Sequence, residues 1–541
     1  MAVDFVGILV SVFSLNRHHV PYFDVVFVMR MTTGDPTGGM RRALAAFPDQ
    51  DMVARIMDKY FIEGGKAMDK PFRSLPMWTI NPPQNLLEAT VLANFCEVWL
   101  AKHNDDSSPI PGAMVGINRL TKVQLPTIAS LYGAILADVD YVLMGAGIPL
   151  RIPGVLDALT AGREATFPID VTGADEPMNI RFDPQEFWTA AGKPDMLQQL
   201  HLERPKFCPI VSSVVLAQSM LKRADGQGPT HGIDGFVVEL PTAGGHNAPP
   251  RGFRYDSVKK SHAVDLNEKG EPVYGPKDEV DLEQFAKATK GLPFWMAGSF
   301  AHPDKFCEVL DLGAAGIQAG TIFALSQESG MHAHTKEELL KRVASGDLTV
   351  FTDPAASPTG FPFKVVEMDD TLSDQSVYEA RPRLCSMGYL RTPYVIEDAA
   401  DSSSSSKSIG YRCAAEPIDD WVKKGGDLAA TQGRKCLCNA LAADCGFPQT
   451  RKYKDDATGE TRQYTELPLV TLGDDVDCVR ELMQQDQTTG AWNYSAAEAL
   501  QFLKAKWEES TAKKMVQEEI KSALESSSST PKVTAKTVAE V

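Results

Sequence analysis

Residues 239–252, with the sequence ELPTAGGHNAPPRG, place His246 directly after two glycines. Because Gly244 and Gly245 carry no side chains, a flat ligand could lie against the main chain there, within reach of the imidazole. An imidazole is well suited to exchange protons near neutral pH. The same residues could also be a surface loop that happens to hold a histidine, so the rest of the chain must decide between the two interpretations.

Two further stretches, MAGS and QAGT, combine small residues with a hydroxyl group. Small residues allow successive backbone N–H groups to face an anion, and a helix N-terminus adds the positive end of its dipole. We therefore expect Gly298, Ser299, Gly320 and Thr321 to bind a phosphate. The alternative is that these small residues only allow a helix and a strand to pack closely.

The stretches MGAG and VGIN extend this pattern. Gly145 and Gly147 would clear space beside a ligand, and Asn118 offers an amide group to a polar ring edge. All of these candidate residues come at the end of an apolar run, so the fold must bring the ends of those runs together.

From residue 75 to about 325, short apolar runs alternate with segments of helical spacing. The runs are LPMWTI, AMVGIN, DYVLMGAG, FCPIVSS, GFVVEL, PFWMAGS and AAGIQAG. Such alternation predicts an α/β fold with a parallel sheet covered by helices. Seven runs, with an eighth expected at the N-terminus, predict a closed (β/α)8 barrel of the TIM type, and a doubly wound open sheet is the alternative. In a barrel, the carboxyl ends of the strands form the active face.

The predicted barrel spans residues 1–350, with two departures from the pattern. The apolar stretches within residues 1–30 do not end in small residues, so we expect an atypical N-terminal strand. Residues 163–206 do not fit the alternation and are expected to form an insertion before the next strand.

The composition changes after about residue 350. We expect residues 351–520 to form an appended C-terminal region, mainly helical or irregular, with a flexible Ser-rich insert at 401–408. Residues 521–541 are too polar to pack and are expected to form a disordered tail.

The C-terminal region contains Cys385, Cys413, Cys436 and Cys438. Four cysteines in a short stretch could bind zinc or an iron–sulfur cluster. The Cys-x-Cys pair lacks the two-residue spacing that is common in such sites, so we expect buried free thiols and no metal.

The net charge of -17 and the pI near 5.1 argue against a nucleic acid or an anionic membrane surface as a partner. The apolar run at residues 5–13 is too short to span a membrane, and Asp4 is unlike the start of a signal peptide. The nine scattered cysteines do not form a secreted disulfide framework. We expect a cytoplasmic protein that acts on a small molecule.

Five motifs in order, VGINRLTKVQLP, DYVLMGAGIP, GFVVELPTAGGHNAPPRG, LPFWMAGS and GAAGIQAGTIFALSQESG, resemble the nitronate monooxygenase family, formerly called 2-nitropropane dioxygenases. The resemblance covers about residues 24–335 and extends to a longer subgroup with a C-terminal region. It implies FMN as the cofactor, with its phosphate over the last two strands. It also implies that His246 lies beside the flavin, either as the base or as a hydrogen-bond partner of the nitro group.

The resemblance implies oxidation of alkyl nitronates or nitroalkanes with O2 to carbonyl compounds and nitrite. Two alternatives use the same barrel. One is an FMN-dependent NAD(P)H enoyl-thioester reductase, which needs the same phosphate site and histidine. The other is a non-catalytic scaffold that has lost FMN.

Overall fold

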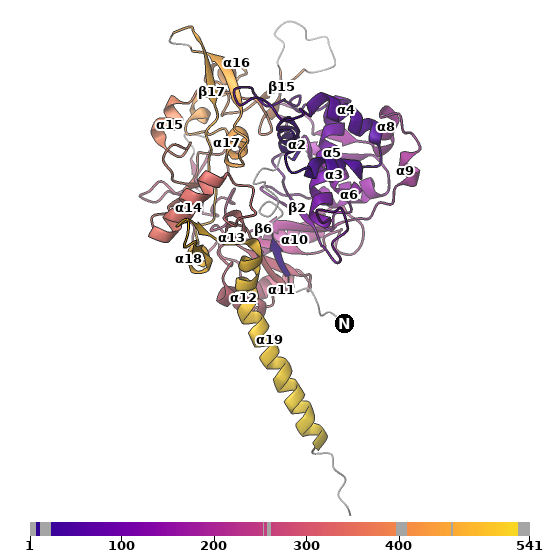
Figure 1. The fold of residues 1–541 in the computed structure, drawn as a ribbon, viewed down its shortest axis with the longest axis vertical. Helices are drawn as coiled ribbons and strands as arrows, with labels where there is room; N and C mark the ends of the chain where they lie inside the picture. Colours follow the sequence, from indigo (N-terminus) through magenta and orange to yellow (C-terminus); the bar gives the residue numbers. More distant parts are fainter. Residues whose placement is uncertain are drawn as a thin grey trace, which may run out of the picture.

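A computed structural model describes residues 7–10, 23–252, 254–256, 261–396, 408–455 and 458–527. The predicted Ser-rich insert lies outside the described residues except for Ser408, as does the predicted tail after residue 527. The chain folds into a body from which the long helix α19 (Ala496–Ser527) extends away (Figure 1). This helix continues into the segment that the composition predicts to be a tail.

The centre of the body is a parallel sheet of seven strands in the order β1-β11-β10-β7-β6-β3-β2. The strands are β1 (Gly7–Val10), β2 (Gly116–Leu120), β3 (Tyr141–Gly145), β6 (Lys206–Val211), β7 (Phe236–Glu239), β10 (Phe294–Ala297) and β11 (Gly316–Ala319). From β2 to β11 the spatial order follows the chain, whereas a doubly wound sheet reverses its order at a switch point. The fold is therefore an α/β barrel of the TIM type, with the N-terminal strand β1 parallel to β11.

The strands of the barrel are connected by helices that cover its outside (Figure 1). These helices are α6 (Thr127–Leu136), α7 (Ile152–Thr160), α10 (Val214–Arg223), α11 (Leu282–Ala288) and α12 (Pro303–Asp311), and the short helix α13 (Thr321–Ala324) follows the last strand, β11. Several begin at polar residues that the sequence supplies. The Ser213 hydroxyl accepts from Leu216 N–H at the start of α10, and the Asp281 carboxylate accepts from Gln284 N–H at the start of α11.

One predicted strand is wrong, because LPMWTI forms no strand in the described part of the chain. The carbonyl of Trp78 accepts from the Arg391 guanidinium at 2.8 Å, and Ile80 N–H donates to the Tyr411 hydroxyl at 2.7 Å. Side chains of the C-terminal region thus satisfy this backbone in place of a neighbouring strand. As a result, β1 and β2 are edges of the described sheet and are not hydrogen-bonded to each other.

An N-terminal group of helices packs against α6. It consists of α2 (Phe23–Thr32), α3 (Gly39–Ala45), α4 (Gln50–Tyr60) and α5 (Gln84–Lys102). Helices α2 and α5 are buried on nearly all sides, which explains their lack of an amphipathic pattern.

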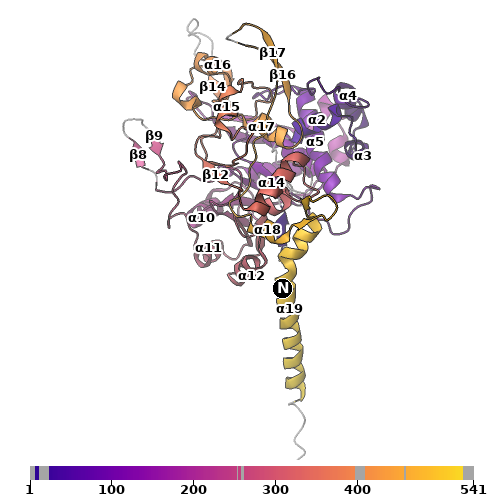
Figure 2. The same ribbon diagram turned by 60° about the vertical axis from the view of Figure 1, so that its left-hand side comes forward.

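The segment expected as an insertion forms an antiparallel pair separate from the barrel, β4 (Ala165–Ile169) with β5 (Met178–Phe182), followed by α8 (Pro184–Ala190) and α9 (Met196–Gln199). A second excursion, after β7, carries the antiparallel pair β8 (Arg254–Asp256) and β9 (Ser261–Ala263), which projects from the body in Figure 2.

The C-terminal region packs against both the N-terminal helices and the barrel (Figures 1 and 2). Its helices are α14 (Ala333–Ser345), α15 (Gln375–Ala380), α16 (Ile418–Lys423), the 3₁₀ turn η1 (Leu428–Thr431), α17 (Leu437–Asp444) and α18 (Asp477–Leu482). It also contains antiparallel pairs that the sequence analysis did not predict: β12 (Val350–Asp353) with β13 (Phe363–Val366), β14 (Thr392–Val395) with β15 (Ile409–Arg412), β16 (Thr450–Lys454) with β17 (Thr461–Thr465), and β18 (Gln484–Gln485) with β19 (Trp492–Asn493).

None of the nine cysteines, all of which lie in the described residues, forms a disulfide bond. Cys96 and Cys208 are fully buried, as expected for core residues. Within the described ranges, no group of three or more His, Cys, Asp or Glu side chains has a geometry that could hold a metal ion. No described helix is both long and apolar enough to cross a membrane.

Candidate functional site

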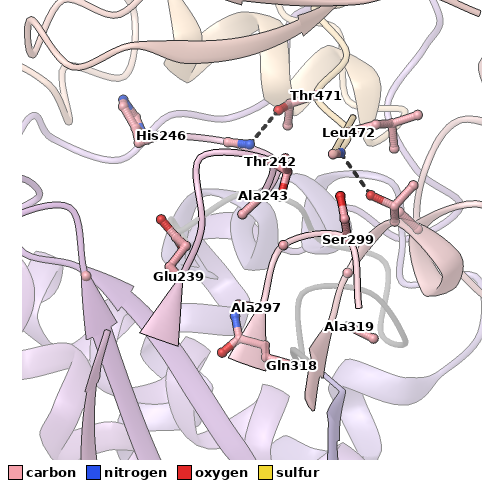
Figure 3. Close-up of a pocket in the computed structure, with 18 of the residues that line it drawn as sticks. Glu239, Thr242, Ala243, His246, Ala297, Ser299, Gln318, Ala319, Thr471 and Leu472 are labelled. Atoms are coloured by element: carbon pink, nitrogen blue, oxygen red, sulfur yellow. Dashed lines mark hydrogen bonds between the residues drawn. The ribbon is translucent and has the colours of Figure 1, made fainter. Parts of the chain in front are cut away.

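A cavity of about 240 Å³ lies at the carboxyl ends of the barrel strands (Figure 3). Strands β2, β3, β6, β7, β10 and β11, or the residues directly after them, each contribute to its wall. Of the predicted site residues, the cavity is lined by Asn118, Gly145, Gly244, Gly245, His246, Gly298, Ser299, Gly320 and Thr321. The barrel therefore brings residues that are more than 200 positions apart, such as Asn118 and Thr321, to one site.

The ends of β10 and β11 form an exposed stretch of backbone on the cavity floor. Gly298 has φ 99°, and Ser299 has φ 61°, a left-handed conformation that costs a residue with a side chain about 1 kcal/mol. Such conformations concentrate at functional sites. The N–H groups of Gly298 and Ser299 have no hydrogen-bond partner within the described part of the chain. A Cβ added to Gly320 would meet no atom within 4 Å and would enter open space.

Thr321 links the floor to the C-terminal region. Its hydroxyl oxygen accepts from Gly473 N–H at 2.9 Å, so the hydroxyl proton remains available to a ligand. Gly473 must be a glycine, because an added Cβ would lie 2.9 Å from the Thr242 carbonyl oxygen. The predicted phosphate-binding residues thus lie next to a point where the backbones of Gly473 and Thr242 come close together. This contact was not predicted from the sequence.

The Gly-Gly-His turn is also tied to the C-terminal region. Gly245 N–H donates to the Thr471 hydroxyl at 2.8 Å, and its carbonyl accepts from Lys364 N–H at 2.9 Å. An added Cβ at Gly244 would lie 2.9 Å from the Leu472 carbonyl carbon. The absence of a side chain at Gly244 therefore makes room for the backbone of Leu472. Gly245 has φ 82°, and no atom lies near the position of its missing Cβ, so the space beside it is open.

His246 is held by residues far along the chain. Its Nε2 is 2.7 Å from the Ser357 hydroxyl oxygen, and its ring packs edge-on against Phe363, with centroids 4.8 Å apart. Burial lowers the pKa of His246 to about 4, because the charged imidazolium loses its hydration there. The side chain is therefore neutral at neutral pH, and Nδ1 has no partner among the described residues.

Three amide or hydroxyl oxygens in the cavity wall have no hydrogen-bond partner within the described residues. They are Asn118 Oδ1, Thr242 Oγ1 and Gln318 Oε1. Buried polar atoms without partners are rare in native proteins, and a bound polar ligand is one explanation. Asn118 was predicted from the sequence as a site residue, whereas Thr242 and Gln318 were not. Gln318 stands next to the small residues of QAGT, so its place at a strand end was the available signal.

Glu239, the last residue of β7, is a second candidate that the sequence analysis missed. Its side chain rises from the strand end toward the cavity in Figure 3. Burial raises the pKa of its carboxyl group to about 8. An acidic residue that closes the apolar run GFVVEL was the signal in the sequence.

The two glycines after β3 differ in their positions. Gly145 lines the cavity, and an added Cβ would lie 3.0 Å from the Ile210 side chain. Gly147 does not line it. Its φ of 139° and the closeness of Thr121, 2.8 Å from an added Cβ, explain a glycine there without a ligand.

The roof of the cavity comes from the C-terminal region. It is formed by Phe363, Leu437, Leu441, Thr471, Leu472, Gly473, Asp475 and Cys478. Most of these side chains are apolar, whereas the unpartnered polar groups lie on the barrel side. The region that the sequence analysis treated as an appendage is therefore part of the site.

The cavity has the features that FMN requires. The free N–H groups after β10 and the open space at Gly320 suit a phosphate, and the unpartnered amide oxygens of Asn118 and Gln318 suit the polar edge of a flavin ring. Ala297, Ala319 and Ile210 add apolar surface for the ring.

Residues 185–358 match the family model of nitronate monooxygenase. This segment, which is less than half of the chain, includes the Gly-Gly-His turn and the ends of β10 and β11. It excludes Asn118, Gly145 and all of the roof residues, which begin at Phe363. No match was found among curated proteins.

Three solved structures resemble parts of the chain. FabK from Thermotoga maritima shares 19% identity over 48% of this chain and 56% of its own, with a TM-score of 0.26. A nitroalkane oxidase from Streptomyces ansochromogenes shares 16% over 47% and 61%, with a TM-score of 0.25. The enoyl reductase domain of MlnA from Bacillus amyloliquefaciens shares 12% over 54% and 56%, with a TM-score of 0.27. The chain thus covers less than two thirds of each, and scores this low say nothing about its substrate.

Proposed function

Because residues 185–358 match the nitronate monooxygenase family, whose members are FMN-dependent oxidoreductases, we propose that the chain oxidises alkyl nitronates or nitroalkanes with O2. The products would be a carbonyl compound and nitrite. The main observation in support of the proposal is that His246 and the small residues after β10 and β11 line one cavity. When bound there, FMN supplies the redox chemistry by accepting electrons from the substrate and passing them to O2.

The cofactor would be held by the barrel side of the cavity. The backbone at Gly298, Ser299 and Gly320, with the Thr321 hydroxyl, would bind the phosphate. Asn118, Gly145, Gly244 and Gly245 would lie around the ring, while Gly147 lies behind the wall and would act only through the loop after β3.

His246 would act on the substrate through Nδ1, the ring nitrogen that Ser357 does not hold. A pKa near 4 makes the protonated imidazole less stable than in water by about 3 kcal/mol, since one pKa unit corresponds to about 1.4 kcal/mol. His246 is therefore a weak base for a carbon-bound proton. This supports a nitronate, already ionised, as the preferred substrate, with His246 as a hydrogen-bond partner of the nitro group.

The roof would exclude water from the reacting atoms. Phe363, Leu437, Leu441 and Leu472 present apolar side chains over the cavity. A site shielded in this way strengthens hydrogen bonds to an anionic substrate, because the local dielectric constant is low.

The proposal is tested with the purified full-length chain. We expect a visible flavin absorption band, O2 uptake with an alkyl nitronate in the absence of NAD(P)H, and release of nitrite. NAD(P)H oxidation that depends on an enoyl thioester, without turnover of nitronate, would instead assign the reductase activity. A colourless protein that stays colourless after addition of FMN would indicate the non-catalytic scaffold.

We expect the enzyme to act in the cytoplasm on a small-molecule substrate. Nine cysteines without a disulfide bond suit a reducing compartment. Fractionation of cells that express the tagged chain would test this location.

A further inference from the structure

Glu239 occupies a position in the cavity that the proposed function has not used. It ends β7, three residues before Thr242 and seven before His246, on the wall between the main cavity and a small adjoining cavity of about 10 Å³. The carboxyl group therefore lies deep in the molecule while part of its surface faces the main cavity.

The Glu239 carboxyl group has no hydrogen-bond or ion-pair partner within the described part of the chain. The other carboxyl group in the cavity wall differs in this respect, because Asp475 is paired with Lys305. The other ionisable groups that line these two cavities are His246, Asp475 and Cys478 in the main cavity and Arg251, Tyr274 and Asp278 in the adjoining one.

None of these neighbours compensates a negative charge on Glu239. Arg251 directs its guanidinium to backbone carbonyls of Lys277 and Ser212. The Tyr274 hydroxyl donates to the Ala248 carbonyl at 3.0 Å, and burial, reinforced by nearby carboxyl groups, raises the pKa of Tyr274. Burial without a cation therefore keeps the Glu239 carboxyl protonated at neutral pH, with a pKa of about 8.

His246 and Glu239 are thus both neutral at neutral pH for the same reason, since burial disfavours the charged form of each. Burial lowers the pKa of the base to about 4 and raises that of the acid to about 8. An ionised carboxylate would repel an anionic ligand, whereas a protonated one can donate a hydrogen bond to it. The cavity is suited to anions only while Glu239 holds its proton.

We propose that Glu239 determines specificity for anionic substrates by holding its proton and donating a hydrogen bond from its carboxyl group to an oxygen of the bound anion. The proposal rests on the proposed function, in which that anion is a nitronate. No bond of the substrate changes in this contact, and the proton stays on Glu239.

The test measures binding of nitrite, the expected product anion, to the FMN-loaded enzyme through the change in flavin absorbance. From about pH 6 to about pH 9, nitrite stays an anion, and of the neighbours named above His246 and Tyr274 keep one protonation state. In the wild-type enzyme, we expect the Kd to be constant below about pH 8 and to rise toward tenfold per pH unit above it.

The matched variants are Glu239→Gln and Glu283→Gln. The amide introduced by Glu239→Gln keeps a hydrogen-bond donor and cannot ionise, so the Kd of this variant for nitrite should not change with pH. Glu283 is an exposed residue of α11, and its variant should follow the wild-type profile. A Kd that is independent of pH in the wild-type enzyme, or an unchanged pH profile in Glu239→Gln, would overturn the proposal.

The same preparation separates this proposal from the proposed function. If the wild-type profile is as expected but no O2 uptake occurs with nitronates, the role of Glu239 in anion binding stands and the assigned reaction is wrong. If nitronates are oxidised but nitrite binds independently of pH, the reaction stands and the role of Glu239 is wrong. If Glu239→Gln fails to fold, the pH dependence of the nitrite Kd in the wild-type enzyme still decides whether Glu239 has this role.

Discussion

The two halves of the cavity are built in different ways. The barrel side is a floor of strand ends, with small residues, exposed backbone and unpartnered polar side chains such as Gln318. The C-terminal side is a roof of apolar side chains on α17 and on the segment 471–475. The floor resembles a ligand-binding surface, whereas the roof resembles a piece of protein core laid over it.

The difference shows where specificity and closure come from. The floor offers hydrogen-bond donors and acceptors that fix the orientation of a ligand, and the roof supplies the apolar surface that shields it. The two are joined by hydrogen bonds from backbone N–H groups to side-chain hydroxyls, Gly473 N–H to Thr321 and Gly245 N–H to Thr471. Changes in the floor should therefore abolish binding or chemistry, and changes in the roof should weaken them.

The largest effect is expected from a substitution that places a side chain in the cavity from its floor. In Gly320→Leu the new side chain would enter the open space of the cavity, and the backbone at φ -119° accepts it without strain. We expect a folded protein that has lost both FMN and nitronate turnover, measured by the flavin absorption band and by circular dichroism. Gly252→Leu, at an equally open glycine outside the cavity, should remain yellow and active. A yellow Gly320→Leu variant would place the cofactor elsewhere.

The next largest effect is expected from the histidine of the floor. His246→Ala should keep its flavin band but lose about 10-fold to 100-fold in kcat/KM for nitronates, because it removes a hydrogen bond to the anionic nitro group that contributes about 1.5 to 3 kcal/mol. Ser357→Ala removes the hydrogen bond to Nε2, together with the hydrogen bonds between the Ser357 hydroxyl and Thr359, and should lose about tenfold or less. Steady-state O2 uptake with an alkyl nitronate measures this. An unchanged kcat/KM for the nitronate in His246→Ala would contradict the hydrogen bond to the nitro group.

A smaller effect is expected from the contact that joins roof and floor. In Gly473→Ala the new methyl group would lie 2.9 Å from the Thr242 carbonyl oxygen and would push the roof segment away. We expect an FMN Kd raised by about tenfold, equivalent to about 1.4 kcal/mol, measured by fluorescence titration of apoprotein. Gly275→Ala, where a Cβ meets no atom, is the control. An unchanged Kd would mean that the roof does not support cofactor binding.

The smallest effect on ligand binding is expected from the roof helix α17, where a buried acid affects the stability of the fold. Asp444 at its end is fully buried, and neither carboxyl oxygen has a partner among the described residues. Burial raises its pKa to about 8 from about 3.8. The folded state therefore binds the proton more tightly, so this contribution to stability is present below pH 3.8 and is lost as the pH rises through 8.

We expect the thermal midpoint of the wild-type protein to fall between about pH 5 and about pH 8.5, and to fall less in Asp444→Asn. The variant with Asp419→Asn, at an exposed position on α16, should follow the wild-type slope. Parallel slopes in Asp444→Asn and wild type would show that Asp444 does not titrate in the folded protein over this range.

Local patterns in the sequence were enough to predict most of the floor. The alternation of apolar runs with helical segments predicted the barrel, and six of the seven runs between residues 75 and 325 are strands of the sheet. The small residues after β10 and β11, and His246 after β7, follow from the rule that strand ends face the active side. These features depend on residues close together in the chain.

The failure at LPMWTI has a tertiary cause. Its composition suits a strand, but Arg391 and Tyr411, more than 300 positions away, satisfy its backbone. The role of residues 351–520 was missed for a similar reason, because no pattern within that region indicates what it covers.

The sequence by itself determined the barrel, the face of the barrel that carries the site, and a histidine beside small strand ends. Only the tertiary structure decided what encloses that site and how its acid and base are charged. The contacts concerned join residues far apart in the chain, 111 positions for His246 and Ser357 and 226 for Gly245 and Thr471. The low pKa of His246 and the high pKa of Glu239 likewise arise from burial by the whole fold, which neighbouring residues in the chain do not specify.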